Sequence, residues 1–349
     1  MLFYIFLFFL VLLFSFCYTY AKDVNVAVCF KIITFLLLFL PSALRYGIGT
    51  DYVNYVDIFF NIKEGVDVRT ELGWVFLNKF CIFFNLNVQW IFIISSFFTI
   101  YYIFKTPKKD FFIVIILFFC LFYLDSYNMT RQGLTMSICW YAYLCFIGGK
   151  KNKSYIYIII SSLFHTSGLI ILLCFFIIDK FKLINKKTTT ILLFCCFFLA
   201  YTNIFMTILS FILSFTKYNV YLEMFEFYNE RSAGFGSIYT LLIRTFILLI
   251  LFNSFRYTNN DIENKFIVFF ILLLELSDVI ALDLYMANRV KLLFYLAYIM
   301  IMVPLYQQKG NVFMKIKKIG FISYFILYYL ILKLITGANA IIPYQMIKF

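Results

Sequence analysis

A polar loop with two glycines, residues 45–52, separates two long apolar stretches and carries side chains suited to chemistry. Arg45 supplies a guanidinium, Asp51 a carboxylate and Tyr52 a phenol. Glycines let the backbone turn where other residues resist, so these groups can be brought together at a membrane edge. The combination indicates a site for a phosphorylated, lipid-linked ligand. The alternative is an ordinary polar loop with interfacial tyrosines.

Three further arginines occur in separate polar segments of the chain. They are Arg131, Arg231 and Arg289. A planar guanidinium binds phosphate oxygens through two parallel hydrogen bonds, which lysine cannot match. We interpret these arginines, together with Arg45, as ligands for a diphosphate or another acidic group. The alternative is scattered interfacial arginines that snorkel toward water.

A carboxylate beside aromatic residues is a candidate general base, because partial desolvation favours its protonated form. Asp51 is the first candidate and Glu71 the second, although Asp51 could equally cap the turn before the next helix. His165 is the only histidine of the chain. It could act as an acid, a base or a phosphate partner. We favour the simpler role of holding a turn by bonding to backbone carbonyls.

Charged residues also occur inside apolar stretches. Arg244 lies in one of them, and Glu275 and Asp278 share a helix face in the next. An unpaired charge at the bilayer centre costs at least ~2.5–3.5 kcal/mol. Pairing is therefore predicted, as a structural ion pair or, alternatively, as a path for protons or lipid phosphates.

The composition determines which elements can position these residues. The chain has 349 residues, of which 64% are hydrophobic and 13% charged, and its mean hydropathy is +0.94. Soluble domains are about half apolar and a quarter charged. The sequence therefore predicts an all-α, polytopic integral membrane protein, with a single integral domain over residues 1–349. The net charge of +13 lies in short lysine clusters, which argues against nucleic acid as a partner.

Apolar runs near the length needed to cross a bilayer predict the spans. The candidates are residues 2–19, 24–41, 88–104, 111–124, 133–148, 189–207, 237–252, 266–282, 290–306 and 319–336. Lysines cluster at 105–109, 150–153, 180–187 and 309–318, and the positive-inside rule places these loops in the cytoplasm.

Two segments interrupt the simple alternation of loops between the cytoplasmic and the outer side of the membrane. A single crossing by residues 154–178 would put one lysine cluster outside, so we expect two short helices that enter from the cytoplasm and turn back near His165. Residues 71–84 suit a helix that lies in the interface. About ten crossings then remain, with both chain ends outside. The loops 42–71, 125–131, 217–236 and 283–289 fall on the same outer side.

The motifs in this order resemble the EpsG-like branch of the Wzy-type polysaccharide polymerases. The resemblance depends on Arg45-x-Gly47-x-Gly49-Thr50-Asp51-Tyr52-x-x-Tyr55, Glu71-x-Gly73, Arg131-Gln132, Phe164-His165-x-Ser167 and Asn288-Arg289. They cover residues 45 to about 300. The loop 217–236 cannot be matched position by position, so Arg231 is carried over only by its placement.

The resemblance implies a GT-C-like glycosyltransferase of the bacterial inner membrane that joins oligosaccharide repeat units carried on undecaprenyl diphosphate, for capsule, exopolysaccharide or lipopolysaccharide. Its site would face the periplasm or exterior and need no metal or other cofactor. Asp51 or Glu71 would be the base, Arg45, Arg131, Arg231 and Arg289 would bind diphosphate, and Tyr52 and Tyr55 would contact sugar. A Wzz-type chain-length regulator is an expected partner. The alternatives are a flippase for the same lipid-linked sugars and an O-antigen ligase. A ligase would usually have a histidine in a large outer loop.

Overall fold

The structure is a computed structural model that describes residues 1–199, 211, 235–283 and 287–347. Within these ranges the regular secondary structure is helical, and an isolated antiparallel β-bridge joins Arg45 to Met346. The described chain divides into two compact units, residues 1–176 with 319–349 and residues 177–318. Each unit is described by itself below, and the single integral domain predicted above stays a prediction.

Unit 1 contains the N-terminal helices and the last helix of the chain. Its elements are α1 (Leu2–Tyr20), α2 (Val24–Ala43), α3 (Tyr52–Lys63), α4 (Leu72–Phe83), α5 (Gln89–Ile103), α6 (Lys108–Phe118), the π-helical segment η1 (Phe119–Tyr123), α7 (Asp125–Asn128), α8 (Thr130–Ile147), α9 (Lys151–Phe164), most of α10 (Ser167–Lys180) and, after α19 (Val312–Tyr324), η3 (Phe325–Ile331), α20 (Leu332–Thr336) and η4 (Ala338–Ala340).

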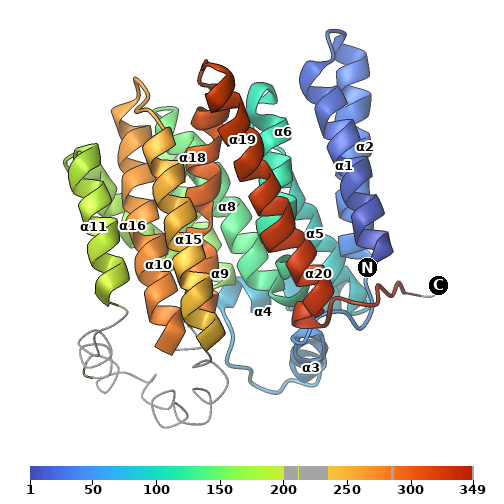
Figure 1. Ribbon diagram of the computed structural model, residues 1–349. Coiled ribbons are helices and arrows are strands. Elements are labelled where there is room, and N and C mark those ends of the chain that lie inside the picture. The colour runs from blue at the N-terminus through green and yellow to red at the C-terminus, as the bar shows by residue number, and fades with distance from the viewer. Residues whose placement is uncertain (200–210, 212–234, 284–286, 348–349) are drawn as a thin grey trace. The chain divides into compact units, whose positions relative to one another are not determined.

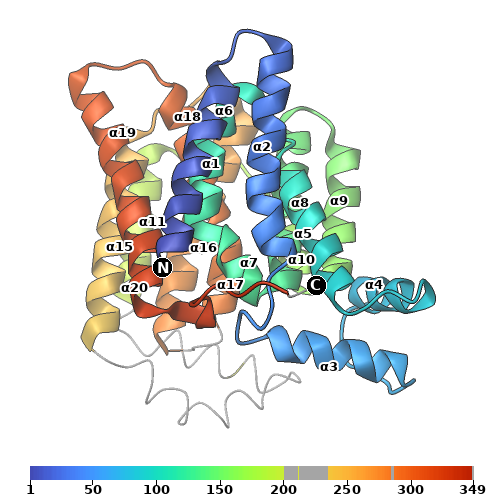
Figure 2. The same ribbon diagram turned by 90° about the vertical axis from the view of Figure 1, so that its right-hand side faces the viewer.

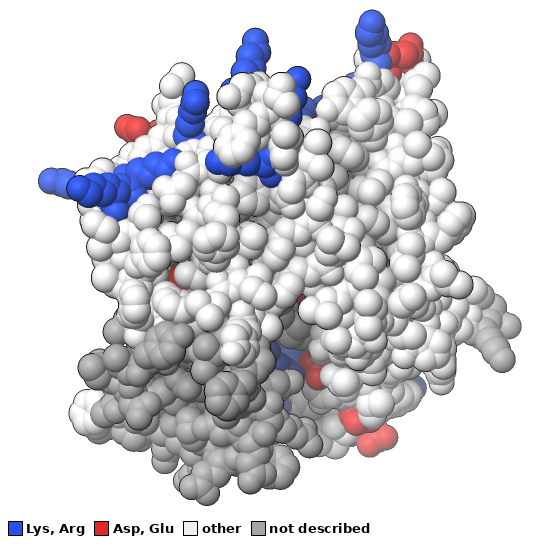
Figure 3. All heavy atoms as spheres, in the orientation of Figure 1, with Lys and Arg blue, Asp and Glu red and all other residues white. Residues whose placement is uncertain are grey.

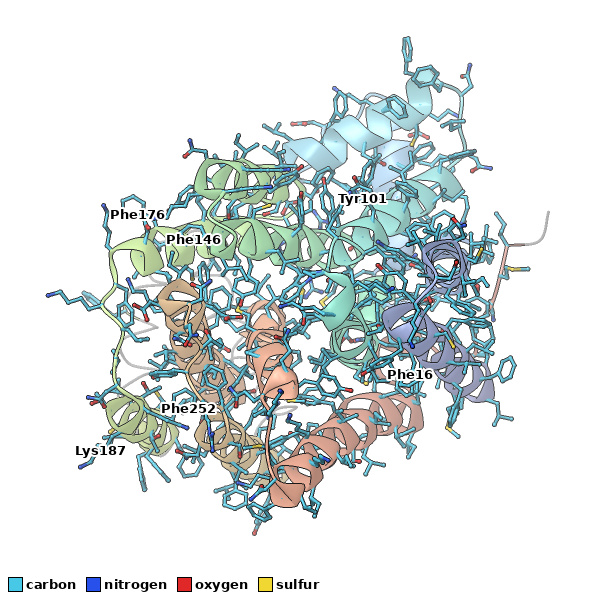
Figure 4. The ribbon with its side chains drawn as sticks, turned by 90° about the horizontal axis from the view of Figure 1, so that it is seen from above. Phe16, Tyr101, Phe146, Phe176, Lys187 and Phe252 are labelled. Carbon is cyan, nitrogen blue, oxygen red and sulfur yellow. The ribbon has the colours of Figure 1, made fainter. Side chains whose placement is uncertain are left out.

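Aromatic packing joins the helices of unit 1. Phe16 of α1, labelled in Figure 4, meets Phe112 of α6 edge to face, with ring centroids 5.4 Å apart. Phe146 of α8 is buried and meets Phe175 of α10 at 5.5 Å. Edge-to-face pairs of this kind add to the burial of apolar area. Phenylalanines such as Phe146 and Phe175 therefore pack one helix against another, whereas others, such as Phe6 and Phe9 of α1, are exposed.

The two ends of unit 1 differ in charge. Helix α5 begins at Gln89, whose side chain donates to the backbone oxygen of Arg45, and ends just before Lys105. Helix α8 begins beside Arg131 and ends just before Lys150. Their 15 and 18 residues rise about 22 and 27 Å. Figure 3 shows basic side chains along the end where α1 joins α2, with an acidic one beside them there, and acidic side chains at the other end, over α3. Within unit 1, lysine clusters and the glycine loop thus lie at opposite ends, as predicted.

Helices α3 and α4 lie across the other helices of unit 1 (Figure 2). Helix α4 exposes an apolar face that includes Leu72, Phe76 and Phe83, each more than two-thirds exposed. Its other face, with Trp74 and Cys81, is fully buried. An exposed apolar stripe on a helix lying crosswise at one end suits the membrane interface predicted for residues 71–84.

Helices α9 and α10 form the predicted hairpin. The Ser154 hydroxyl of α9 donates to Ala142 at one end of α8, and the Thr135 hydroxyl of α8 donates to Ser161 of α9 at the other, at 2.7 and 3.0 Å. The hairpin therefore extends along α8, and its turn at residues 165–166 lies at the end that carries Arg131. This depth was not predicted from the sequence.

The C-terminal segment returns to the glycine loop. The amide of Tyr46 donates to Gln345, the amide of Gly49 to Ala340, and the amide of Ile347 to Leu44, at 3.0, 3.3 and 3.0 Å. At the N-terminus, the Tyr4 hydroxyl donates to Ile341 at 2.8 Å. Both chain ends thus lie at the same end of unit 1, where Figure 1 marks them, in agreement with the predicted common side.

Unit 2 consists of apolar helices. The described ones are α11 (Lys186–Leu199), α15 (Phe235–Ser254), α16 (Asp261–Asp283), α17 (Ala287–Phe294) and α18 (Leu296–Gln307). Lys186 of α11 donates to the backbone oxygens of Asn253, in the last turn of α15, and of Phe255, just after it, at 2.8 and 2.6 Å, near the labels Lys187 and Phe252 of Figure 4. The C-terminal end of α15 is therefore held by a side chain of α11.

The length and hydropathy of the helices are those of a polytopic membrane protein. Among the described residues, four helical stretches are long and apolar enough to cross a bilayer: Leu2–Tyr20, Val24–Ala43, Asn288–Gln307 and Val312–Thr336. Shorter apolar helices accompany them, including Gln89–Ile103 and Tyr239–Ser254. The all-α membrane fold is confirmed. The count of ten crossings stays a prediction, and the candidate span 189–207 lies partly outside the described residues.

Candidate functional site

The glycine loop is fastened to α7 by one asparagine. Asn128 accepts hydrogen bonds through Oδ1 from the Thr50 hydroxyl and the Asp51 amide, at 2.9 and 2.8 Å. Gly49 makes this contact possible. Its φ is +99°, and an added Cβ would lie 2.9 Å from the Cα of Asn128. The loop conformation that presents Asp51 therefore depends on glycine at position 49.

Asp51 occupies the N-cap position of α3, but its side chain makes no capping hydrogen bond to the first turn. The capping role considered for it from the sequence is thus absent. The side chain is partly exposed. The backbone amide of the buried Tyr55 donates to the backbone oxygen of Asp51 at 3.2 Å, and the charge of Asp51 raises the pKa of the Tyr55 phenol.

Arg45 lies inside unit 1, only 1% exposed. Its guanidinium donates to Ser42, to Ser96 and, at 2.8 Å, to the hydroxyl of Thr130. It also lies over the rings of Phe92 and Tyr127, at 4.7 and 5.2 Å from their centroids. These contacts join α2, α5, α7 and α8. The structure gives Arg45 a positioning role, and the predicted contact with diphosphate would require the guanidinium to leave this network.

Arg131 and Glu71 form the ion pair at the centre of the candidate site. They come from the first turn of α8 and the start of α4, and their side chains are 19% and 15% exposed. The Thr70 hydroxyl accepts from Arg131 at 2.5 Å and donates to Glu71 at 3.1 Å. A guanidinium and a carboxylate that are partly open to solvent are therefore held at the end of unit 1 that carries the glycine loop.

Tyr55 links this pair to Asp51. The Arg131 guanidinium lies 5.8 Å from the centroid of the Tyr55 ring. Burial raises the pKa of the Tyr55 hydroxyl, Arg131 opposes that effect, and Asp51 adds to it. Both charged groups therefore act on the same phenol. Asp51 and Arg131 thus lie near Tyr55, and Glu71 is paired with Arg131; the catalytic and ligand roles predicted for these residues stay predictions.

The predicted sugar contacts of two tyrosines need revision. Tyr52 is 7% exposed and stacks on Phe92, with centroids 4.8 Å apart, while Tyr55 is 2% exposed and packs against Trp74. Both rings belong to the core between α3, α4 and α5. Phe92 covers one face of Tyr52, and Trp74 and the guanidinium of Arg131 lie against Tyr55, so both rings mainly support the residues around them.

The tip of the α9–α10 hairpin completes the cluster. The amide of Thr166 donates to the second oxygen of Glu71 at 3.1 Å. Close packing brings these elements together: a Cβ at Gly73 of α4 would lie 2.7 Å from the carbonyl oxygen of Leu163. His165 is therefore next to the ion pair. The turn-holding role predicted for it fits its ring contacts with the backbone amide and the hydroxyl of Ser167.

The contacts of Glu71 set its protonation. Burial raises the pKa of this carboxyl group, but Arg131, the amide of Thr166 and His165 outweigh it and hold the pKa below the ordinary value. Glu71 is therefore ionised at neutral pH and already engaged by donors. A general base must accept a further proton, so this environment favours Asp51 over Glu71 for that role.

The predicted charges of unit 2 form a cluster of their own. Arg244 lies 3.1 Å from Asp278, and Lys291 lies 3.4 Å from the same carboxylate. The Thr245 hydroxyl donates to Glu275 at 2.6 Å. The pairing of Arg244 with Asp278 is as predicted. Arg289 is exposed on α17, and since it belongs to unit 2, its meeting with Arg131 stays a prediction. Arg231 lies outside the described residues.

Sequence reasoning missed an ion pair between distant segments of unit 1. Lys333 lies 2.6 Å from Asp125, and the side chain of Asn339 donates to the other oxygen of that carboxylate at 2.9 Å. The signal available was a lysine inside the last apolar stretch, which requires a partner in a membrane. Asn128 and Thr70 carried no signal, because polar residues are ordinary in loops. Among the described residues, no group of three or more His, Cys, Asp or Glu side chains is placed to hold a metal ion.

The fold and site define a multi-pass, all-helical membrane protein with a partly exposed arginine–carboxylate cluster at one end of its first unit. The sequence pattern of the EpsG family matches residues 28–346, and the chain belongs to that family. Membership indicates a polymerase-type role in polysaccharide synthesis. The comparisons with curated proteins and with solved structures gave no match.

Proposed function

We propose that the protein is a glycosyltransferase that polymerises oligosaccharide repeat units carried on undecaprenyl diphosphate, at the outer face of the bacterial cytoplasmic membrane. The observation that carries the proposal is the cluster of Arg131, Glu71, Tyr55 and Asp51 in a chain of the EpsG family. It combines a cation suited to diphosphate with a carboxylate suited to a hydroxyl proton.

The proposed reaction joins two lipid-linked glycans. A hydroxyl oxygen of the acceptor attacks the anomeric carbon of the donor, and the bond from that carbon to the diphosphate oxygen breaks. Undecaprenyl diphosphate leaves with the bonding electron pair, and the hydroxyl proton passes to Asp51. The products are a lengthened lipid-linked glycan and free undecaprenyl diphosphate, so the step needs no oxidant or reductant.

Each residue of the cluster has a distinct proposed role. Arg131 neutralises the charge that develops on the leaving diphosphate, which is a transition-state interaction. Glu71 and Thr70 orient the guanidinium, because both hold it from one side. Asn128 fixes the loop that presents Asp51. Arg289 is the candidate ligand of the second diphosphate, and a chain-length regulator remains a candidate partner.

The testing experiment uses purified protein in lipid nanodiscs with a synthetic undecaprenyl-diphosphate repeat unit. The wild type is expected to give a ladder of glycan lengths. Asp51→Asn keeps the size and the backbone contacts of the residue, so it should abolish the ladder while insertion and thermal stability are retained. A ladder of wild-type length from Asp51→Asn would remove Asp51 from the chemistry. No ladder from folded wild-type protein would refute the proposed activity.

A further inference from the structure

His165 is held in one tautomer by the turn in which it lies. The backbone amide of Ser167 donates to Nδ1 of the ring at 3.2 Å, and the Ser167 hydroxyl lies 2.6 Å from the same nitrogen. An amide N–H can only donate, so Nδ1 must offer its lone pair. The proton of the neutral imidazole is then on Nε2.

The ring lies next to the charged cluster. Thr166, the adjacent residue, donates its amide to Glu71 at 3.1 Å, and His165 is close enough to lower the pKa of that carboxyl group. The other oxygen of Glu71 is bound to Arg131. The side chain of His165 is partly exposed. The hairpin thus brings a hydrogen-bond donor of fixed tautomer to the end of α8 that carries Arg131.

We propose that His165 is a catalytic hydrogen-bond donor, which binds an oxygen of the leaving diphosphate through Nε2–H and does not act as the base. The inference rests on the proposed function, since it names a second group for the diphosphate that Arg131 receives. A base would need a free lone pair, and Nδ1 already accepts from Ser167. A donor aimed at an anionic oxygen strengthens as charge develops there.

The only histidine of the chain makes the tautomer directly measurable. Protein labelled with 15N-histidine gives a single imidazole, whose two-bond proton–nitrogen correlations distinguish the Nε2–H form, the Nδ1–H form and the imidazolium. At pH 7 we expect Nε2 protonated and Nδ1 not. Undecaprenyl diphosphate should shift the Nε2 resonance, whereas undecanol, which has no phosphate, should not. A protonated Nδ1 would overturn the inference.

Variants separate this inference from the proposed function. Removing one donor to a developing oxyanion costs about 10²–10³ in kcat, so His165→Ala should lose about that much. His165→Gln places an amide donor near the position of Nε2 and should recover at least about tenfold over His165→Ala, whereas His165→Asn should not. Equal losses in the Gln and Ala variants, with both proteins folded, would refute the donor role.

Binding distinguishes the two kinds of failure. If undecaprenyl diphosphate binds the protein, measured by its thermal shift, but leaves the Nε2 resonance unchanged, the donor role is wrong while the proposed function stands. If undecaprenyl diphosphate gives no thermal shift at any concentration tested, both the donor role and the proposed function are refuted.

Discussion

A methyl group added at Gly73 of α4 should separate Glu71 from the tip of the α9–α10 hairpin. In Gly73→Ala, the new Cβ would lie 2.7 Å from the carbonyl oxygen of Leu163. Carbon–oxygen contacts are ordinarily at least about 3.3 Å, so α4 must retreat from the hairpin by about 0.6 Å. The hydrogen bond from the Thr166 amide to Glu71, now 3.1 Å, then lengthens beyond the useful range.

The expected consequences follow from that displacement. A hydrogen bond to a charged group contributes about 1.5–3 kcal/mol, and overpacking costs about 1–3 kcal/mol, so the free energy of unfolding should fall by about 2 kcal/mol or more. Because Glu71 orients Arg131, polymer formation should fall about ten- to hundredfold. The assays are thermal unfolding in detergent and the rate of ladder formation from lipid-linked repeat units.

Gly320 provides the matched control for this substitution. It also lies in a helix of unit 1, but an added Cβ there meets nothing within 4 Å. Gly320→Ala should therefore leave activity unchanged and stabilise slightly, as alanine does in a helix. Wild-type stability and activity in Gly73→Ala would show that contact between α4 and the hairpin does not position the site.

Two other substitutions test particular contacts. Glu71 has a lowered pKa, so its ion pair stabilises the fold fully above the ordinary pKa of 4.5 and loses that effect as the pH falls through the lower folded value. The free energy of unfolding, measured between pH 3 and 7, should show this acid-induced loss in the wild type but not in Glu71→Gln. The same fall in the free energy of unfolding at low pH in both proteins would contradict a stabilising role for the ionised Glu71. Asp125→Ala leaves Lys333 unpaired and should destabilise the fold by ~3 kcal/mol. In Asp125→Ala, amide hydrogen exchange in residues 337–347 should accelerate. The control Asp57→Ala, at an exposed position, should leave this exchange unchanged. Unchanged exchange in Asp125→Ala would mean that the ion pair of Asp125 with Lys333 does not hold the C-terminal segment.

The helices were largely predictable, because a bilayer demands apolar runs of a given length and lysines mark their cytoplasmic ends. The α9–α10 hairpin followed from two lysine clusters that had to share a side. Its depth did not follow, since it depends on contacts of Ser161 and Leu163 with other helices. Likewise, no pattern in residues 337–347 shows that this segment returns to the glycine loop.

The candidate site was predictable in its residue types and not in its pairings. Arg131 and Glu71 were both singled out, but their ion pair joins segments 60 positions apart, and a single sequence contains no measure of such contacts. Arg45 shows the opposite difficulty. A loop arginine can face solvent or the protein interior, and its burial depends on Ser96, Thr130 and two aromatic rings from other helices.

Arg131→Lys tests most directly whether the guanidinium of this cluster binds the leaving diphosphate. Lysine keeps the charge but loses the planar pair of donors. With purified protein and a synthetic undecaprenyl-diphosphate repeat unit, we expect kcat/KM to fall by about 10² or more while the protein remains folded. Turnover within about twofold of the wild type would contradict the assignment, since a single point charge would then suffice.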